Sequence, residues 1–121
     1  MSGVIFIDMN GLKVINDTEG HLAGNAALCT VAGFLVGLYG ADHVYRLGGD
    51  EFVVLLQHIT ESEFSSQLKR LRDEASHLGK LSIAAGGQWI ADAVEIMNAI
   101  QEADNAMYRD KAEYYKKKNK Q

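Results

Sequence analysis

The chain has 121 residues, and its 47% hydrophobic content supplies one core and excludes a multi-domain arrangement. Its formal net charge of -4 lacks the basic excess of a nucleic-acid-binding domain. Its one cysteine, Cys29, excludes a disulfide framework and a zinc site, and its apolar helical surroundings predict a buried side chain. With no apolar run of about 18 residues and no signal-peptide pattern, we expect a soluble domain without direct membrane contact.

The first predicted elements are a short strand and a helix. Val4 to Ile7 is a wholly apolar run rich in β-formers, which predicts a strand that is buried on both faces and ends at Asp8. From Asn25 onward, apolar residues recur every three or four positions and predict a helix that covers a sheet and ends at Gly40. These residues are Leu28, Val31, Ala32, Leu35, Leu38 and Tyr39.

A β-hairpin is predicted next. Val44 to Leu47 and Phe52 to Leu56 are β-prone runs joined through Gly48-Gly49, a pair able to take the positive φ angles of a tight turn. Asp50 and Glu51 follow the glycines directly, so we expect both carboxylates at the hairpin tip.

The remaining elements are a helix, a strand and a last helix. Thr60 with Glu63 is typical of a capping box, and Leu81 to Ala85 predicts a fourth strand. Asp92 with Glu95 predicts the start of the last helix. The second helix carries Phe64, Leu68, Leu71, Ala75 and Leu78 on one face, and the last helix carries Ile96, Ile100, Ala103 and Met107. This order predicts an α+β fold with a ferredoxin-like βαββαβ core and an added C-terminal helix.

In this topology the first strand lies beside a hairpin strand, so Asp8 can approach Asp50. Two carboxylates are the protein ligands that Mg²⁺ typically takes, together with phosphates and water. The turn Asn10 to Leu12 offers backbone N–H groups to a phosphate, with Lys13 beside it. The alternative is structural: Asp8 caps the turn, Gly48-Gly49 closes the hairpin, and the acids are solvated. The pattern alone leaves both interpretations open.

Three segments carry a family resemblance. "RLGGDEF" at Arg46 to Phe52 resembles the signature of the GGDEF domain of diguanylate cyclases, which make cyclic di-GMP from two GTP molecules. "FIDMNGLKVINDTEGHLAGN" at Phe6 to Asn25 is similar to the metal and nucleotide segment of that family. "EADNAMYRDKAEYYKK" at Glu102 to Lys117 is similar to its closing helix. The segments keep the order of the family and span almost the whole chain, and the resemblance implies the palm-like sheet of nucleotidyl cyclases.

The resemblance also implies roles for particular residues. It implies an Mg²⁺ or Mn²⁺ site formed by Asp8, Met9 through its carbonyl, and Asp50. It implies catalytic roles for Asp50, as the acid that assists deprotonation, and for Glu51 and Lys13 beside it. It implies a nucleotide site in which Gly11, Leu12, Lys13 and Lys111 bind the phosphates, and Asn16 and Asn25 contact guanine. In this site Gly48 and Gly49 bring the backbone close to the nucleotide.

The chain departs from the family at several positions. Asn25 stands where the family has a guanine-contacting aspartate, and the lost charge predicts weaker or less selective guanine binding. Asp42 remains from an inhibitory R-x-x-D site, but Tyr39 replaces the arginine and lacks its bidentate fork. The N-terminal helix, which supplies an acidic partner for Arg46, is missing. We therefore expect residues 1–121 to be a single, N-terminally truncated GGDEF-type domain.

The last segment has its own departure. Tyr114, Tyr115 and Lys116 replace the closing glycine-arginine-asparagine of the family, which makes its last strand doubtful here. The stripe of Met107, Tyr108 and Tyr115 favours core packing over a cofactor site.

Two function classes stay open. The resemblance implies a diguanylate cyclase that uses GTP as a transient homodimer, with a sensor or regulatory domain upstream, in the cytoplasm or tethered there to a membrane sensor. The alternative is a non-catalytic GTP-binding or dimerisation module that regulates a neighbouring domain. Asp50 and Glu51 are retained, which favours catalysis. Nucleic-acid binding would need exposed aromatics on the central strands and a basic face, and the net charge opposes it.

Overall fold

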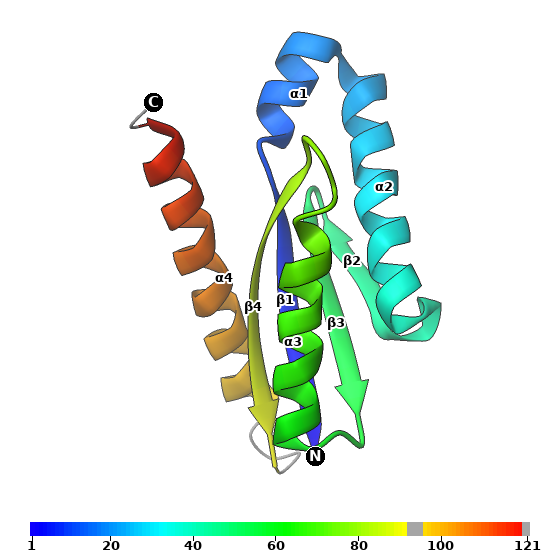
Figure 1. The fold of residues 1–121 in the computed structure, drawn as a ribbon, viewed down its shortest axis with the longest axis vertical. Helices are drawn as coiled ribbons and strands as arrows, with labels where there is room; N and C mark the ends of the chain where they lie inside the picture. Colours follow the sequence, from blue (N-terminus) through cyan, green and yellow to red (C-terminus); the bar gives the residue numbers. More distant parts are fainter. Residues whose placement is uncertain (92–95, 120–121) are drawn as a thin grey trace.

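The computed structural model describes residues 1–91 and 96–119. The strands are β1 (Ser2–Asn10), β2 (Val44–Gly48), β3 (Glu51–Gln57) and β4 (Ser82–Ile90). The helices are α1 (Leu12–Glu19), α2 (His21–Tyr39), α3 (Glu61–Ala75) and α4 (Ile96–Asn119), with a 3-10 turn, η1, at Ala41–His43. α1, the β2–β3 turn and the C-terminal part of α4 lie toward the same end of the sheet (Figure 1).

The four strands form an antiparallel sheet in the order β2-β3-β1-β4. β3 lies between β1 and β2, and β1 lies between β3 and β4, which is the split βαβ arrangement. The prediction of an α+β fold with a ferredoxin-like core and an added C-terminal helix is therefore confirmed.

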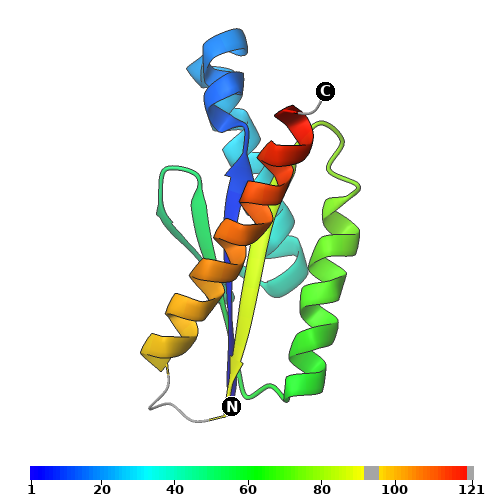
Figure 2. The same cartoon turned by 90° about the vertical axis from the view of Figure 1, so that its left-hand side faces the viewer.

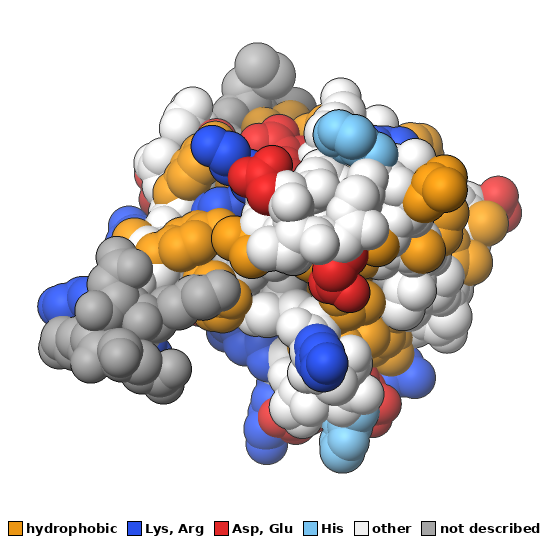
Figure 3. Space-filling model, turned by 90° about the horizontal axis from the view of Figure 1, so that it is seen from above, with side chains coloured by type: hydrophobic (Ala, Val, Ile, Leu, Met, Phe, Trp, Pro, Cys, Tyr) orange, Lys and Arg blue, Asp and Glu red, His pale blue; other side chains and the backbone are white. Residues whose placement is uncertain are grey.

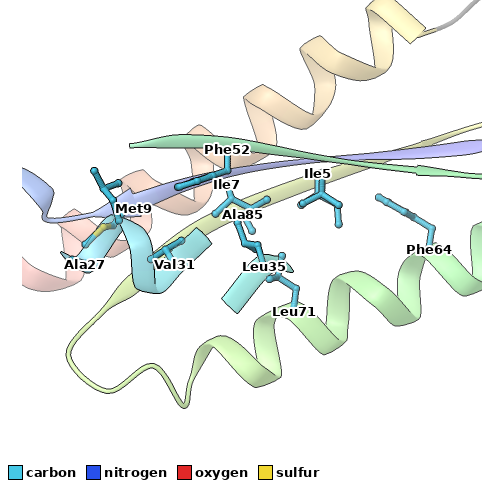
Figure 4. Close-up of a cluster of buried hydrophobic side chains, with 12 residues drawn as sticks. Ile5, Ile7, Met9, Ala27, Val31, Leu35, Phe52, Phe64, Leu71 and Ala85 are labelled. Carbon is cyan, nitrogen blue, oxygen red and sulfur yellow. The ribbon is translucent and has the colours of Figure 1, made fainter. Parts of the chain in front are cut away.

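Helices cover both faces of the sheet (Figure 2). Because successive strand residues point to opposite faces, alternate residues enter two cores. The larger core lies under α2 and α3 (Figure 4) and includes Ile5, Ile7, Met9, Val31, Leu35, Phe52, Phe64, Leu71 and Ala85. The smaller core lies under α4 and contains Val4, Phe6, Val53, Ala84, Ala103 and Met107. β1 is thus buried on both faces, as its apolar run predicts.

β1 is longer than predicted. It continues past Asp8 to Asn10, because its last residues pair with β4 in a register that sets Asp8 opposite Ala84. Glu51 of β3 is opposite Asp8 on the other side. Asp8 therefore lies inside the sheet, on the face covered by α4, and not at the end of its strand.

The connection from β1 to β2 contains two helices where the sequence predicts a turn and one helix. α1 is only eight residues long, and its apolar face consists of the partly buried Leu12 and Ile15, a stripe too short to distinguish a helix from a turn in the sequence. Gly20, with φ 92°, separates α1 from α2. The helix predicted from Asn25 accordingly begins earlier, at His21.

The second half of the fold agrees better with prediction. Thr60 and Glu63 form the predicted capping box, with both reciprocal hydrogen bonds at 3.1 Å. Leu78 lies beyond the end of α3, and β4 continues to Ile90 through two glycines. The predicted helix start at Asp92 and Glu95 lies outside the described residues.

α2 is unusually apolar. In the described part of the chain it is the one helix that is long and apolar enough to cross a membrane by length and composition, with a mean hydropathy of 1.6, although core helices of soluble proteins pass the same test. Its buried residues, which include Leu28, Val31 and Leu35, pack against the sheet. The prediction of a buried Cys29 is wrong, because this side chain is exposed and lines a cavity between α2 and the hairpin.

Candidate functional site

Two carboxylates and one ammonium group meet where α4 crosses the end of β1. Nζ of Lys111 lies 2.7 Å from Oδ2 of Asp8 and 3.9 Å from Oδ2 of Asp50. The N–H of Met9 donates to the carbonyl oxygen of Asp50 at 3.0 Å, which fixes the hairpin turn against β1. The structure therefore brings together Asp8, Met9, Asp50 and Lys111, and the metal-binding roles of the first three stay predictions.

The electrostatics of this cluster are those of a buried acid beside a partly exposed one. Asp8 is only 4% exposed, and burial raises its pKa to about 6, with a further increase from Asp50 and an opposing effect from Lys111. Burial alone would lower the pKa of Lys111, but its hydrogen bond to Asp8 and the charges of both carboxylates raise it. The ammonium group thus balances part of the negative charge.

The donor set fits a hard cation. Oδ1 of Asp8 and Oδ1 of Asn10 are buried oxygens with no hydrogen-bond partner among the described residues. A buried carboxylate oxygen without a partner carries a desolvation cost that a cation would remove. The described residues contain no group of three or more His, Cys, Asp and Glu side chains that could hold a metal ion. The site therefore offers two carboxylates and the Met9 carbonyl, which suits a hard divalent cation that keeps further ligands from water or phosphate.

We expect the contribution of Asp8 to the stability of the metal-free chain to fall as the pH rises from about 4 to about 7, because the folded chain binds the Asp8 proton more tightly than the unfolded chain. This contribution is fully present below the ordinary pKa of 3.8 and is lost as the pH passes the folded value of about 6. Urea unfolding with a chelator should show this loss relative to Asp8→Asn, on the order of 1–3 kcal/mol, since other groups cancel in the comparison. Parallel pH profiles of the two chains would contradict the assignment.

The hairpin turn holds Asp50 through glycine geometry. Gly48 and Gly49 have φ angles of 139° and 52°, which side-chain-bearing residues rarely adopt. Nε and Nη2 of Arg46 donate to the Gly49 carbonyl at 3.2 and 2.7 Å, so Arg46 closes the turn from within the hairpin. Glu51, the first residue of β3, is close enough to α4 for its charge to raise the pKa of Tyr108.

The predicted phosphate turn follows β1. Gly11 has φ 74° and caps the start of α1. Its N–H donates to the hydroxyl of Tyr115 at 3.1 Å, so a side chain of α4 occupies this donor. Lys13 is exposed on α1, and Lys111 lies on the carboxylates. The roles of Gly11, Leu12, Lys13 and Lys111 toward phosphate stay predictions.

The two asparagines predicted at guanine lie on α1 and α2. Asn25 lines a cavity of about 340 Å³ between α2 and the hairpin, together with Cys29, Arg46 and others. Asn16 of α1 packs against Gly24 of α2, where an added Cβ would collide with the Asn16 amide. The absence of a side chain at position 24 therefore gives Asn16 its place.

Sequence reasoning missed two tyrosines. Met107 is buried as predicted, but Tyr108 and Tyr115 are 51% and 36% exposed, so their assignment to the core is wrong. Ala103, Met107, Lys111 and Tyr115 follow each other at intervals of four and share one face of α4. This spacing, continued past the buried residues to Lys111, is the signal that would have placed Tyr115 at the site.

Charge around this end of the molecule is mixed. Acidic and basic side chains alternate on the face seen in Figure 3, without a large patch of one sign. The overall charge of this face therefore gives no general attraction for a phosphate, and the phosphate roles predicted for particular groups, such as Lys111, do not follow from it.

Comparison with known proteins agrees with this geometry. The family described as "Diguanylate cyclase, GGDEF domain" matches residues 1–117. Diguanylate cyclase DosC of Escherichia coli is 36% identical over 87% of this chain and 25% of its own length, and DgcP of the same organism is 33% identical over 98% of this chain and 36% of its own length. This chain thus spans about a quarter to a third of these curated relatives.

Solved structures give the same result. The GGDEF domain of TpbB, or YfiN, from Pseudomonas aeruginosa matches with a TM-score of 0.79 at 29% identity, over 93% of this chain and 72% of that one. A microbial GGDEF domain described in its interaction with cyclic di-GMP matches with a TM-score of 0.77 at 32% identity, over 93% of this chain and 73% of that one. From the carboxylate pair, the glycine turn and these matches, we conclude that the chain belongs to the GGDEF domain family of diguanylate cyclases.

Proposed function

We propose that this domain condenses two GTP molecules into cyclic di-GMP and two pyrophosphates, as a transient homodimer with one GTP on each protomer. The observation that carries the proposal is the meeting of Asp8, Asp50 and Lys111 next to the Gly11 turn. Family membership supplies the reaction, and the unpartnered Oδ1 of Asp8 supplies a reason for a cation at this place.

In the proposed reaction each 3′-hydroxyl oxygen forms a bond to the α-phosphorus of the other GTP, and the bond from that phosphorus to the bridging oxygen of pyrophosphate breaks. Asp8, Asp50 and the Met9 carbonyl would hold Mg²⁺ or Mn²⁺, which when bound supplies charge neutralisation and a lower pKa of the attacking hydroxyl. Asp50 accepts the hydroxyl proton, and Glu51 keeps the site negative from the adjoining position. Lys111 and Lys13, with the N–H groups of Gly11 and Leu12, bind the leaving phosphates.

The protomer alone is insufficient for this chemistry, because one site holds one GTP and the product needs two. Facing sites place both nucleotides within reach of each other, which removes much of the entropic cost of a bimolecular step. The curated relatives are longer than this chain, so we propose that a sensor or regulatory domain upstream controls the pairing, in the cytoplasm or at a membrane sensor.

The direct test is chromatographic analysis of products after incubation with GTP and Mg²⁺, with Asp50→Ala as the comparison. Cyclic di-GMP formed by the parent chain and absent with the variant supports the proposal. GTP binding without product, at protein concentrations high enough to pair the protomers, would favour the non-catalytic GTP-binding or dimerisation module instead.

We expect Asn25→Asp to bind GTP about fivefold more tightly than the parent chain, because a carboxylate accepts a stronger hydrogen bond from guanine than an amide does. The gain should be confined to GTP, so ATP titrated in parallel serves as the control. Calorimetric titrations that give the same GTP affinity for both chains would show that position 25 does not contact the base.

Cyclic di-GMP should not inhibit the chain through the remnant of the inhibitory site at Asp42. Tyr39, at the position of the missing arginine, donates its hydroxyl to the Gln67 carbonyl at 3.1 Å, and burial raises its pKa to about 12. It is therefore engaged with α3 and offers no positive charge to a product phosphate. Initial rates measured with added product should stay unchanged; saturable product binding that Asp42→Ala abolishes would disprove this.

A further inference from the structure

We propose that Tyr115 is a specificity-determining residue of the nucleotide site, whose hydroxyl occupies the Gly11 amide until a phosphate oxygen displaces it. The inference rests on the proposed function, because it concerns the phosphates of the same nucleotide. Its evidence is a contact between segments 104 residues apart: the Gly11 N–H donates to the Tyr115 hydroxyl oxygen at 3.1 Å.

The surroundings hold the Tyr115 ring in this position. Nζ of Lys111 lies 5.9 Å from the centroid of the ring, and the Tyr114 ring meets it edge-on with centroids 5.0 Å apart and an interplanar angle of 83°. Lys111 is itself fixed by Asp8 at 2.7 Å. The tyrosine is thus tied through Lys111 to the carboxylates, and the hydroxyl is aimed at the turn.

The hydroxyl oxygen satisfies the donor that a phosphate would use. Gly11 precedes the first residue of α1 and has its φ angle in the left-handed region. Its N–H points toward an acceptor outside the helix. Only one acceptor can take this N–H with good geometry at a time. A phosphate oxygen must therefore displace the tyrosine hydroxyl toward solvent, where 36% of the side chain is already exposed.

Tyr115 therefore reduces the affinity for ligands that place a phosphate at Gly11, and leaves ligands without that phosphate unaffected. Tyr115→Phe removes the competing oxygen and keeps the ring that contacts Lys111 and Tyr114. In the parent chain the phosphate must break the hydrogen bond between Gly11 and Tyr115 before it can bind. Without this competing bond, the variant should bind the triphosphate roughly two- to tenfold more tightly.

The test is calorimetric titration of the parent chain and Tyr115→Phe with Mg²⁺ and 3′-deoxy-GTP, which lacks the attacking hydroxyl and cannot be condensed. Guanosine, which has no phosphate, is titrated in parallel. Tyr45→Phe is the matched control, because it removes a hydroxyl that donates to the Asp42 carbonyl at 3.1 Å, away from the turn. Amide hydrogen exchange at Gly11 without nucleotide gives a second readout, and it should be faster in Tyr115→Phe alone.

Tighter binding of 3′-deoxy-GTP by Tyr115→Phe, with unchanged guanosine binding and an unchanged Tyr45→Phe, supports the inference. Equal or weaker binding by Tyr115→Phe overturns it, and weaker binding would instead make the hydroxyl a donor to phosphate. The proposed function survives both of those results. If neither parent nor variant binds 3′-deoxy-GTP, the GTP site itself is contradicted and the inference falls with it.

Discussion

Asp8→Asn should reduce the formation of cyclic di-GMP by at least about a hundredfold while the chain stays folded. The amide keeps the size of the side chain and can still accept the hydrogen bond from Lys111, which lies 2.7 Å from Oδ2 in the parent. The variant loses the negative charge of Asp8. It also loses the buried carboxylate oxygen Oδ1, which has no hydrogen-bond partner among the described residues and is free to bind a cation. The loss should therefore fall on metal binding and on the chemical step.

The measurement is the initial rate with GTP over a range of Mg²⁺ concentrations, beside the thermal unfolding of each chain. Asp73→Asn, a change at an exposed carboxylate on α3, is the matched control and should retain the parent rate. An Asp8→Asn chain that is folded and as active as the parent would remove Asp8 from the site.

Gly86→Ala should destabilise the chain by about 2–3 kcal/mol, through overpacking between β4 and α4. A Cβ at position 86 would lie 2.6 Å from the carbonyl oxygen of Ala103 and 2.6 Å from the carbonyl carbon of Ala106, and it would also collide with the backbone N of Met107. These atoms are helix backbone and cannot rotate away as a side chain can. α4 must therefore shift as a whole, and Lys111 and Tyr115 shift with it.

Urea unfolding of the two chains measures this effect. Gly37→Ala is the matched control, because it makes the same change on an exposed face of α2 where no atom lies within 4 Å. Alanine in an open helical position should stabilise by roughly 0.5–1 kcal/mol, so the two changes are expected to have opposite signs. A Gly86→Ala chain as stable as the parent would mean that α4 does not depend on this close contact.

The sequence predicted the fold well where local signals and topology agree. The apolar run before Asp8, the glycine pair before Asp50 and the capping box at Thr60 each correspond to the expected element. Once the strand order is known, the approach of Asp8 to Asp50 follows from it, because neighbouring strands fix which residues can meet.

What the sequence failed to predict depends on tertiary contacts. α1 is eight residues long, and its apolar stripe of Leu12 and Ile15 is too short to separate it from the turn at Gly11 in the sequence. β4 continues through Gly86, a weak strand former, because a helix backbone packs directly on it. Tyr115 has an apolar ring and a polar hydroxyl, so the helical pattern alone does not show whether it enters the core or a site. Only the crossing of α4 over the end of β1 brings its hydroxyl to Gly11.

The central claim is that two protomers, each with a carboxylate pair, join two GTP molecules. The most direct measurement is the initial rate of cyclic di-GMP formation from GTP and Mg²⁺ as a function of protein concentration. We expect the rate to rise with the square of the protein concentration while the dimer is scarce, and to vanish with Asp50→Ala. A rate linear in protein over this range, or product formed equally by Asp50→Ala, would contradict the two-protomer mechanism at this site.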